Sequence, residues 1–383
     1  MIAYDKTRLE NTFFLEGAQQ LREGGFITRE QLASAQGQTP ALKTHRNLLV
    51  RAGFFLLGSL LYSSISGVVS LFVFTANIDA FKFAIFLYAL IGLAGSEFCA
   101  KQHFFAHGLD DGFMLGFVTL TALAVGDILE SVTAGFLALA LAGALACLRY
   151  VHTLCAVLSF MGVVGFFCAL SFDAGIIPKF YLPIIGLAIA MAGYAFYHFC
   201  ARRDGWYRNA WTAVQVSSLV LGYVSANYFV VRELSVALLD WKPTPGSDIP
   251  LAWLFYALTI ALPVVYIGYS IRLRNKPMLW IGVAAWACSA LTFYHYFGAI
   301  RPEWALVLAG LLLFAIAVGL IRRLRHKESG VTFEKDRHSG HNTLLYAQAV
   351  LVNSQIDVEP TIPQSDLPFG GGGFSGGGSE GSY

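Results

Sequence analysis

The stretch VTAGFLALALAGALACLRYVHTLCAVLSFMGVVGFFCALSF, residues 132–172, decides the fold class. It contains an apolar run at 132–148 and a second at 151–172, with only Arg149 and Tyr150 between them. Each run is close to the length that a helix needs to cross a hydrocarbon layer of ~30 Å. Because two residues cannot carry the chain across a bundle, the stretch predicts two antiparallel membrane helices.

Similar apolar runs occupy most of the remaining chain. Of the 383 residues, 56% are hydrophobic and 13% are charged, and the mean hydropathy is +0.60, whereas soluble proteins carry about 25% charged residues. Lipid leaves backbone polar groups unpaired unless they bond within a helix or a closed barrel, and these runs are too long for barrel strands of ~10 residues. The prediction is an all-α polytopic membrane bundle. Its ten expected spans are residues 52–74, 81–99, 112–129, 132–148, 151–172, 180–200, 211–231, 251–271, 277–298 and 303–321.

The distribution of lysine and arginine predicts the orientation of these spans. With the N-terminus in the cytoplasm, 21 of the 26 basic residues fall in segments on that side and five fall outside. Basic residues favour the cytoplasmic side of a membrane. Ten spans with both termini cytoplasmic therefore account for the charges, and the first span is expected to direct its own insertion because residues 1–47 are polar.

Four regions are expected along the chain. The N-terminal one should contain two helices, because Gly24 and Gly25 break the first and Thr28 lies three residues before Gln31, the spacing of a capping box. This region is either a solvated lead-in to the first span or a docking module for a partner protein. The Gly-rich end cannot bury a core and is expected to be disordered. The regions are residues 1–47 (cytoplasmic helices), 48–321 (membrane bundle), 322–368 (cytoplasmic segment) and 369–383 (Gly-rich tail).

Ionisable side chains near the cytoplasmic ends of the spans form a first candidate site, since burying such groups in lipid is costly. His103 and His107 have i,i+4 spacing and would share one face of a helix, where a nearby aspartate could complete a metal site. The alternative is a polar helix cap at the membrane surface. Together these residues would line a vestibule or proton path: Glu97, His103, His107, Asp110, Asp111, His152 and His198.

A second candidate pocket, in the membrane or at its outer face, follows from treating the bundle as two halves of five spans. Five is odd, so such halves would be inverted repeats, as in many secondary transporters. Serine and proline in the first and sixth spans would then mark unwound segments, whereas helix capping and an aromatic belt are the alternative. The pocket would include Ser64, Pro183, Asn227 and His295.

Known catalytic and cofactor motifs do not occur in the sequence. It has no P-loop, no G-x-G-x-x-G after a strand and no G-x-S-x-G elbow. None of the six cysteines forms C-x-x-C, and all lie in or beside apolar runs, so buried reduced thiols are expected. We therefore assign no cofactor, no metal, no catalytic residue and no nucleic-acid partner.

Three segments and the C-terminus resemble a group of multi-pass bacterial membrane proteins that carry only domain-of-unknown-function names. The segments are GFITREQ at 25–31, LDDG at 109–112 and NYFVVREL at 227–234, and the C-terminus shares the Gly-rich ending. The resemblance implies a bacterial inner-membrane location. It implies no activity and assigns a role to no residue.

Three classes of function remain open from the sequence. An accessory or structural membrane component, binding partner proteins through its cytoplasmic ends, fits the scarcity of charge within the spans and the long termini. A small-solute transporter or permease would bring the second candidate pocket together. A membrane-embedded metal-dependent enzyme would instead bring Glu97, the two histidines and an aspartate within metal-ligand distance. The oligomeric state does not follow from the sequence.

Overall fold

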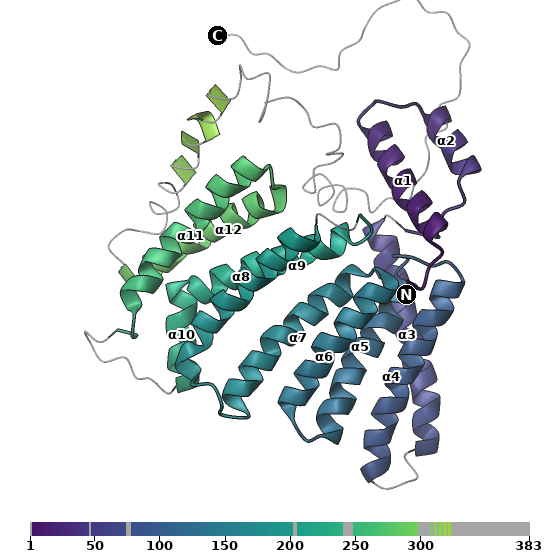
Figure 1. Cartoon of the computed structure of the whole chain (residues 1–383), viewed down its shortest axis with the longest axis horizontal. Helices are drawn as coiled ribbons and strands as arrows, with labels where there is room; N and C mark the ends of the chain where they lie inside the picture. Colours follow the sequence, from purple (N-terminus) through teal and green to yellow (C-terminus); the bar gives the residue numbers. More distant parts are fainter. Residues whose placement is uncertain are drawn as a thin grey trace, which may run out of the picture. The chain divides into compact units, whose positions relative to one another are not determined.

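The computed structural model describes residues 2–45, 47–73, 78–201, 205–239 and 248–297, and scattered single positions between 307 and 322. Within this part of the chain there are twelve α-helices, one 3-10 turn and no strand (Figure 1). The all-α fold class is confirmed. Most of the expected tenth span and both expected regions beyond it lie outside the described residues.

The N-terminal region contains the two helices that the sequence predicts. Helix α1 (Lys6–Glu23) ends before Gly24, and α2 (Arg29–Gln38) begins after Thr28. The capping box is formed as expected, because the Thr28 hydroxyl accepts a hydrogen bond from Gln31 N at 3.2 Å and the Gln31 side chain accepts one from Thr28 N at 2.9 Å. These bonds satisfy two backbone donors that the helix leaves unpaired at its start.

This N-terminal region packs against one end of the bundle. Ala3 N donates to Arg149 O at 2.8 Å, and Lys43 forms a β-bridge to the chain near Phe104 through hydrogen bonds of 2.8 and 3.0 Å. Leu9 of α1 is fully buried. Backbone pairing and apolar burial thus fix residues 2–45 against the loops that connect the membrane helices.

Eight helices among the described residues are long and apolar enough to cross a membrane. Their large apolar side chains also point outward: Leu60, Leu71 and Phe72 are 66%, 74% and 77% exposed. A soluble protein rarely exposes such a surface, whereas lipid would cover it. The eight are α3 (Leu48–Val73), α4 (Ile78–Lys101), α5 (Leu109–Ile128), α6 (Val132–Tyr150), α7 (Thr153–Phe172), α8 (Leu182–Cys200, preceded by the 3-10 turn Lys179–Tyr181), α11 (Ala252–Leu273) and α12 (Lys276–Phe297).

The expected seventh span, 211–231, is broken, which corrects the prediction of one continuous helix. Helix α9 (Arg208–Ala226) ends before Asn227, and α10 (Tyr228–Leu239) continues at a bend of 69°. Asn227 has extended backbone angles, and its side-chain oxygen accepts a hydrogen bond from Val230 N at 3.3 Å. Asparagine is a preferred N-cap residue, so the residue that reads as part of a span starts a new helix.

The hairpin between α6 and α7 positions one candidate site. The predicted turn at Arg149 and Tyr150 is displaced by two residues, because Tyr150 stays in α6 and is buried, and Val151 takes the left-handed conformation (φ 53°). The two helices pack closely: a Cβ on Gly143 would lie 2.8 Å from Ser159 N. Only a residue without a side chain permits this approach.

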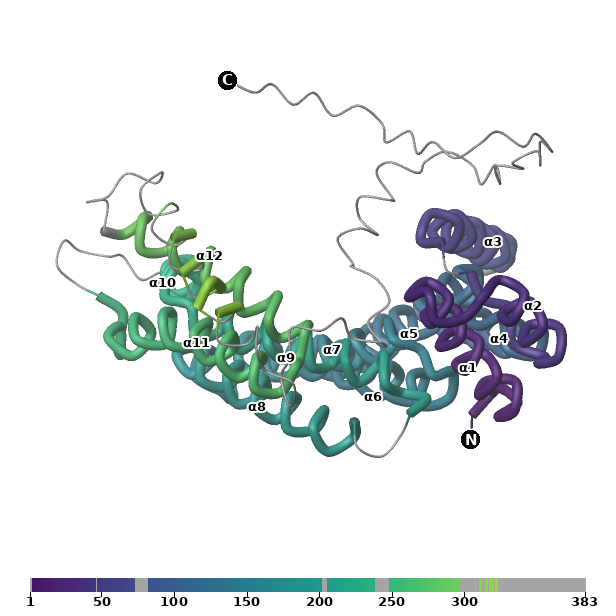
Figure 2. The backbone as a smooth tube through the Cα atoms, turned by 90° about the horizontal axis from the view of Figure 1, so that it is seen from above, coloured from purple at the N-terminus to yellow at the C-terminus, as the bar shows by residue number. Residues whose placement is uncertain are grey.

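Neighbouring helices in the chain contact one another through most of the bundle. Helix α5 contacts α3, α4, α6 and α7, and α7 also contacts α8 and α9. Figure 2 shows α3 beside α4 and α5. Helix α9 packs against α11 and α12. The chain divides into two units, Met1–Gly340 and His341–Tyr383, and all of the helices named above belong to the first.

Candidate functional site

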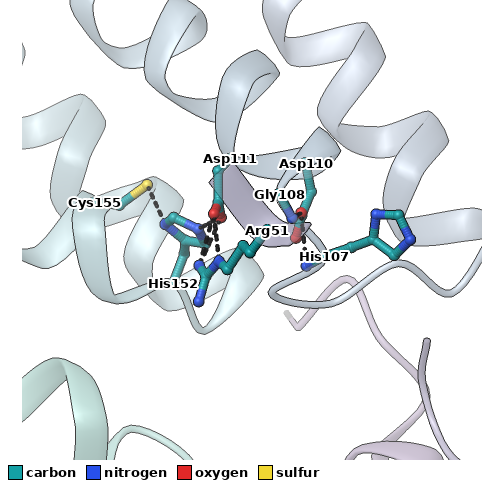
Figure 3. A network of polar contacts seen from close by, with 7 residues as sticks. All are labelled: Arg51, His107, Gly108, Asp110, Asp111, His152 and Cys155. Atoms are coloured by element: carbon teal, nitrogen blue, oxygen red, sulfur yellow. Dashed lines mark hydrogen bonds and ion pairs between the residues drawn. The ribbon is translucent and has the colours of Figure 1, made fainter. Parts of the chain in front are cut away.

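Three charged side chains from separate elements meet at the N-terminal end of α5. Asp111 lies in the first turn of α5, Arg51 in the first turn of α3, and His152 in the turn between α6 and α7. Arg51 Nε donates to Asp111 Oδ2 at 2.7 Å and Arg51 Nη2 to Asp111 Oδ1 at 3.0 Å, while His152 Nε2 donates to Asp111 Oδ1 (Figure 3). We call Arg51, Asp111 and His152 the ionic network.

Burial makes the ionic network strongly interdependent. The side chains of Asp111 and His152 are each 5% exposed. The Asp111 carboxylate gains from the N-terminal end of the α5 dipole as well as from its two cationic partners. Removing the Asp111 carboxylate would leave the charges of Arg51 and His152 without compensation.

His152 is protonated because of this environment. Burial by itself would lower its pKa, but the hydrogen bond to Asp111 and the contact with Cys155 outweigh burial and raise the pKa of His152 to about 10. His152 Nδ1 lies 3.5 Å from Cys155 Sγ. At neutral pH the network therefore holds two cations and one carboxylate, which suits an ion-pair lock and does not suit a base that exchanges protons near pH 7.

Asp110 organises the adjacent loop. It is fully buried, and its Oδ1 accepts hydrogen bonds from His107 N at 3.1 Å and Gly108 N at 2.9 Å. The Oδ2 atom has no hydrogen-bond partner within the described residues. Gly108 has a φ of 107° and lies against Arg51 O, where a Cβ would clash. Asp110, in the first turn of α5, thus holds the loop that leads into this helix.

The predicted helical pairing of His103 and His107 is wrong. Residues 102–108 form a loop in which His103 and Ala106 have φ values of 66° and 50°, so i,i+4 spacing does not place the imidazoles on one face. The His107 ring instead packs 4.2 Å from the ring of His45, and burial, then the neighbouring His45, lower the pKa of His107. Among the described residues, no three His, Cys, Asp or Glu side chains are arranged to hold a metal.

The other members of the first candidate pocket lie elsewhere. Glu97 pairs with Arg149 and accepts a hydrogen bond from the Tyr150 hydroxyl at 2.6 Å. His198 is exposed on α8, and its ring stacks on Tyr194 at 6.3 Å. The structure therefore joins Asp111 to His152, and Asp110 to the backbone of His107. The sequence interpretation missed Arg51, because it counted this residue only among the charges that predict orientation. Its position directly before the expected span 52–74 could have marked it as a candidate.

A second polar cluster surrounds the break between α9 and α10. Asn227 Nδ2 donates to the Tyr223 hydroxyl at 2.7 Å and to Thr292 Oγ1 at 3.1 Å. The Tyr223 and Ser289 hydroxyls are 2.9 Å apart, and Tyr228 N donates to Thr259 Oγ1 at 2.9 Å. All these side chains are buried. We call the set the hydroxyl network; it consists of Tyr223, Asn227, Thr259, Ser289 and Thr292.

The remaining residues of the second candidate pocket lie outside this network. Ser64 is exposed on α3 and donates to Leu60 O of its own helix at 2.8 Å. His295 is exposed on α12 and packs edge-on against Phe229 at 5.3 Å. Pro183 lies in the first turn of α8 and lines a cavity that residues of α10 also line.

That cavity has a volume of about 450 Å³ and lies between α7, α8, α9 and α10. Val230 and Val231, which line it, follow Asn227 within one turn of α10. The lining is almost entirely apolar; its polar side chains are Cys168, Lys179, Ser225 and Ser235. Its volume is within the range of small-molecule sites, ~300–1,000 Å³.

Comparison with known proteins adds no family or activity. Neither family models, nor curated proteins, nor solved structures match this chain. The candidate sites are therefore interpreted from their own geometry.

The six cysteines form no disulfide bond and differ in burial. All six cysteines are free thiols; three of them, Cys99, Cys147 and Cys155, are buried as expected. Cys288 is exposed on α12, against the expectation of burial. Cys288 lies on the outer surface of an apolar helix that is long enough to cross a membrane. Such a surface would face lipid, where a small apolar thiol is well accommodated.

Proposed function

We propose that this chain is a transporter or permease that carries a small, largely apolar molecule. The observation that carries the proposal is the broken span α9–α10 directly beside the 450 Å³ cavity. Transporters often bind their substrates at discontinuous membrane helices, where the packing of the bundle can change around the site. A continuous α9–α10 helix would place α10 away from η1 (Lys179–Tyr181), which it contacts.

The hydroxyl network supports this assignment because it supplies hydrogen-bond acceptors for backbone N–H groups at the break. A span that breaks in a membrane loses backbone hydrogen bonds, and each unsatisfied group costs several kcal/mol in hydrocarbon. Here Thr259 and Asn227 accept from Tyr228 N and Val230 N. Thr259 belongs to α11, and Asn227 is the residue at the break. Because neither acceptor is part of α10, a change in these two hydrogen bonds would let α10 move.

The topology belongs to the same proposal. Eight spans and the broken pair correspond to the first nine expected spans, and we propose that residues 303–321 form a tenth. The excess of basic residues on one side supports a cytoplasmic location of both termini, and the resemblance to bacterial proteins supports a location in the inner membrane.

An accessory role through partner proteins remains a prediction from the sequence. The apolar face of the N-terminal region contacts its own bundle through Leu9 and Leu42, which leaves that face unavailable to a partner. Residues 323–383, which carry the other expected partner contacts, lie outside the described residues.

The transport proposal is tested by filling the cavity. Cys168→Trp places a large ring in its lining, and Leu141→Trp places the same ring on an outward-facing position of α6 that is 58% exposed. Cells lacking the native protein would express each variant at equal level, and uptake and efflux of labelled lipophilic solutes of anionic, neutral and cationic type would be measured. We expect at least one solute to move several-fold faster with the wild type and with Leu141→Trp than with Cys168→Trp. Equal rates for all solutes would contradict the proposal.

A further inference from the structure

The cavity between α7, α8, α9 and α10 has a charged entrance and an apolar interior. Its lining includes Phe167, Ile189 and Leu221 in the interior, and Phe172, Phe180 and Lys179 among its exposed members. Exposed lining residues mark the side on which the cavity opens. A ligand that enters there meets one cation, Lys179, beside exposed apolar side chains, and apolar side chains alone further in. The exposed apolar members of the lining are Phe172, Phe180, Val224, Leu234 and Pro250.

Lys179 is the charged residue of this lining, and among the described residues it pairs with no carboxylate. Its side chain is exposed, its Nζ lies 5.1 Å from the centre of the Phe172 ring, and no described carboxylate is within ion-pair distance of it. The other charged cavity-lining lysine, Lys82 in a separate cavity of about 660 Å³, pairs with Glu130 at 3.0 Å. The two entrances therefore differ in net charge.

The polar groups inside the cavity are few, and one of them is already hydrogen-bonded within its own helix. Ser235 donates to Val231 O of its own helix at 2.7 Å. Ser225 packs against Gly186, where an added Cβ would clash with its hydroxyl. A polar solute would lose its hydration in this interior without finding partners, which is costly, whereas an alkyl chain would gain from burial.

We infer that the cavity binds a single-chain amphiphile with an anionic head, its alkyl chain between α7–α10 and its head at Lys179. The inference rests on the proposed function, since it names the class of ligand for the same cavity. The head is a carboxylate or a phosphate, both of which a lysine ammonium binds as a point charge. The chain length is limited by the enclosed volume.

Binding measurements with defined probes test the inference on the purified full-length chain in a non-ionic detergent. The probes are saturated fatty acids of increasing length, the matching alkyl trimethylammonium ions and alkyl alcohols, and an anionic lysophospholipid. We expect the affinity for fatty acids to rise about fourfold for each added methylene until the chain fills the cavity. Anionic probes should bind several-fold more tightly than cationic probes of equal length.

Two substitutions separate the head from the chain. Lys179→Gln should weaken the fatty acid about threefold to fivefold and leave the alcohol unchanged, since an exposed ion pair contributes little more than that. Lys101→Gln, an exposed lysine at the far end of α4, is the matched control. Cys168→Trp should abolish saturable binding of all chains.

Each outcome decides the inference. Equal affinity for anionic and cationic heads, or no effect of Lys179→Gln, overturns it while the transport proposal stands on the flux experiment. Binding that Cys168→Trp leaves intact places the ligand elsewhere and overturns it as well. Preference for the lysophospholipid over the fatty acid supports it and identifies a membrane lipid as the source; the reverse preference supports it with a free acid as the source.

Discussion

Asp111 and His152, 41 positions apart in the sequence, are hydrogen-bonded and join the first turn of α5 to the turn between α6 and α7. Arg51 binds the same carboxylate from α3 (Figure 3). One buried aspartate thus ties three parts of the bundle together, in the helix turn that follows the loop on which the N-terminal region packs. The first two predictions follow from this arrangement.

Replacing Asp111 with asparagine should destabilise the bundle. The amide keeps the shape of the side chain but leaves the Arg51 and His152 charges without a carboxylate, and breaking a buried pair typically costs about 3–5 kcal/mol. Arg51 is partly exposed, so the lower end of that range is expected. Thermal unfolding in detergent, followed by tryptophan fluorescence, would measure the change. Lys101→Gln, on an exposed site, should change the melting temperature little; an Asp111→Asn protein as stable as the wild type would show that the network does not lock the bundle.

The stability of the wild type should fall between pH 6.5 and about pH 10. The pKa of His152 is raised from 6.5 to about 10 in the folded chain, so its contribution is fully present below pH 6.5 and disappears as the pH rises through the folded value. The same titration of melting temperature on His152→Gln should give a flatter profile over this interval. Parallel profiles for the two proteins would refute a protonated His152.

Asn227→Leu should weaken the junction between α9 and α10. The substitution removes the cap on Val230 N and the donors to Tyr223 and Thr292, and a lost cap with unpaired buried partners costs about 1–3 kcal/mol. Asn227→Ser keeps a hydroxyl oxygen for the cap and loses the amide that donates to Tyr223 and Thr292, so its destabilisation should be smaller than that of Asn227→Leu. Hydrogen exchange of the amides in 228–235 would report the local opening; unchanged exchange in Asn227→Leu would mean that the bend does not depend on this side chain.

Leu9→Ala should loosen the N-terminal region from the bundle. Leu9 is fully buried, and truncating a buried leucine costs about 2–5 kcal/mol. Phe14→Ala on the same helix removes a larger side chain that is 59% exposed, so it is the matched control. Limited proteolysis within residues 24–47 should be faster in Leu9→Ala than in the control. Equal cleavage of both would indicate that burial of α1 does not hold the region in place.

Reporter enzymes fused after residues 47 and 322 should both be active in the cytoplasm. This follows if the broken pair α9–α10 crosses the membrane as one span and residues 303–321 form another, since ten crossings return the chain to the starting side. If α9–α10 were re-entrant instead, the second fusion would report the opposite side.

Much of the architecture could be predicted from local sequence. A long apolar run must become a helix in lipid, because no other segment satisfies its own backbone hydrogen bonds there. The capping box at Thr28 and Gln31 is equally local, since both partners lie within one turn. For the same reason the first six expected spans, the eighth and the ninth correspond to helices of the structure, with boundaries shifted by a few residues.

The sites depended on contacts that local patterns do not contain. The residue Arg51 lies 60 positions from its partner Asp111, and its role follows only once α3 packs on α5. His103 and His107 have the spacing of a helical pair, but the bridge from Lys43 and the turn before Asp110 hold them in a loop.

The long apolar runs alone were enough to predict a helical membrane bundle, because the cost of exposing backbone polar groups to lipid acts on each segment separately. The break at Asn227 required side chains from α11 and α12: the Thr259 hydroxyl accepts a hydrogen bond from Tyr228 N, and the Thr292 hydroxyl accepts one from Asn227 Nδ2. The cavity beside it exists only where four helices fail to fill the space between them. Both arise from the packing of distant segments, and hydropathy does not encode which segments will meet.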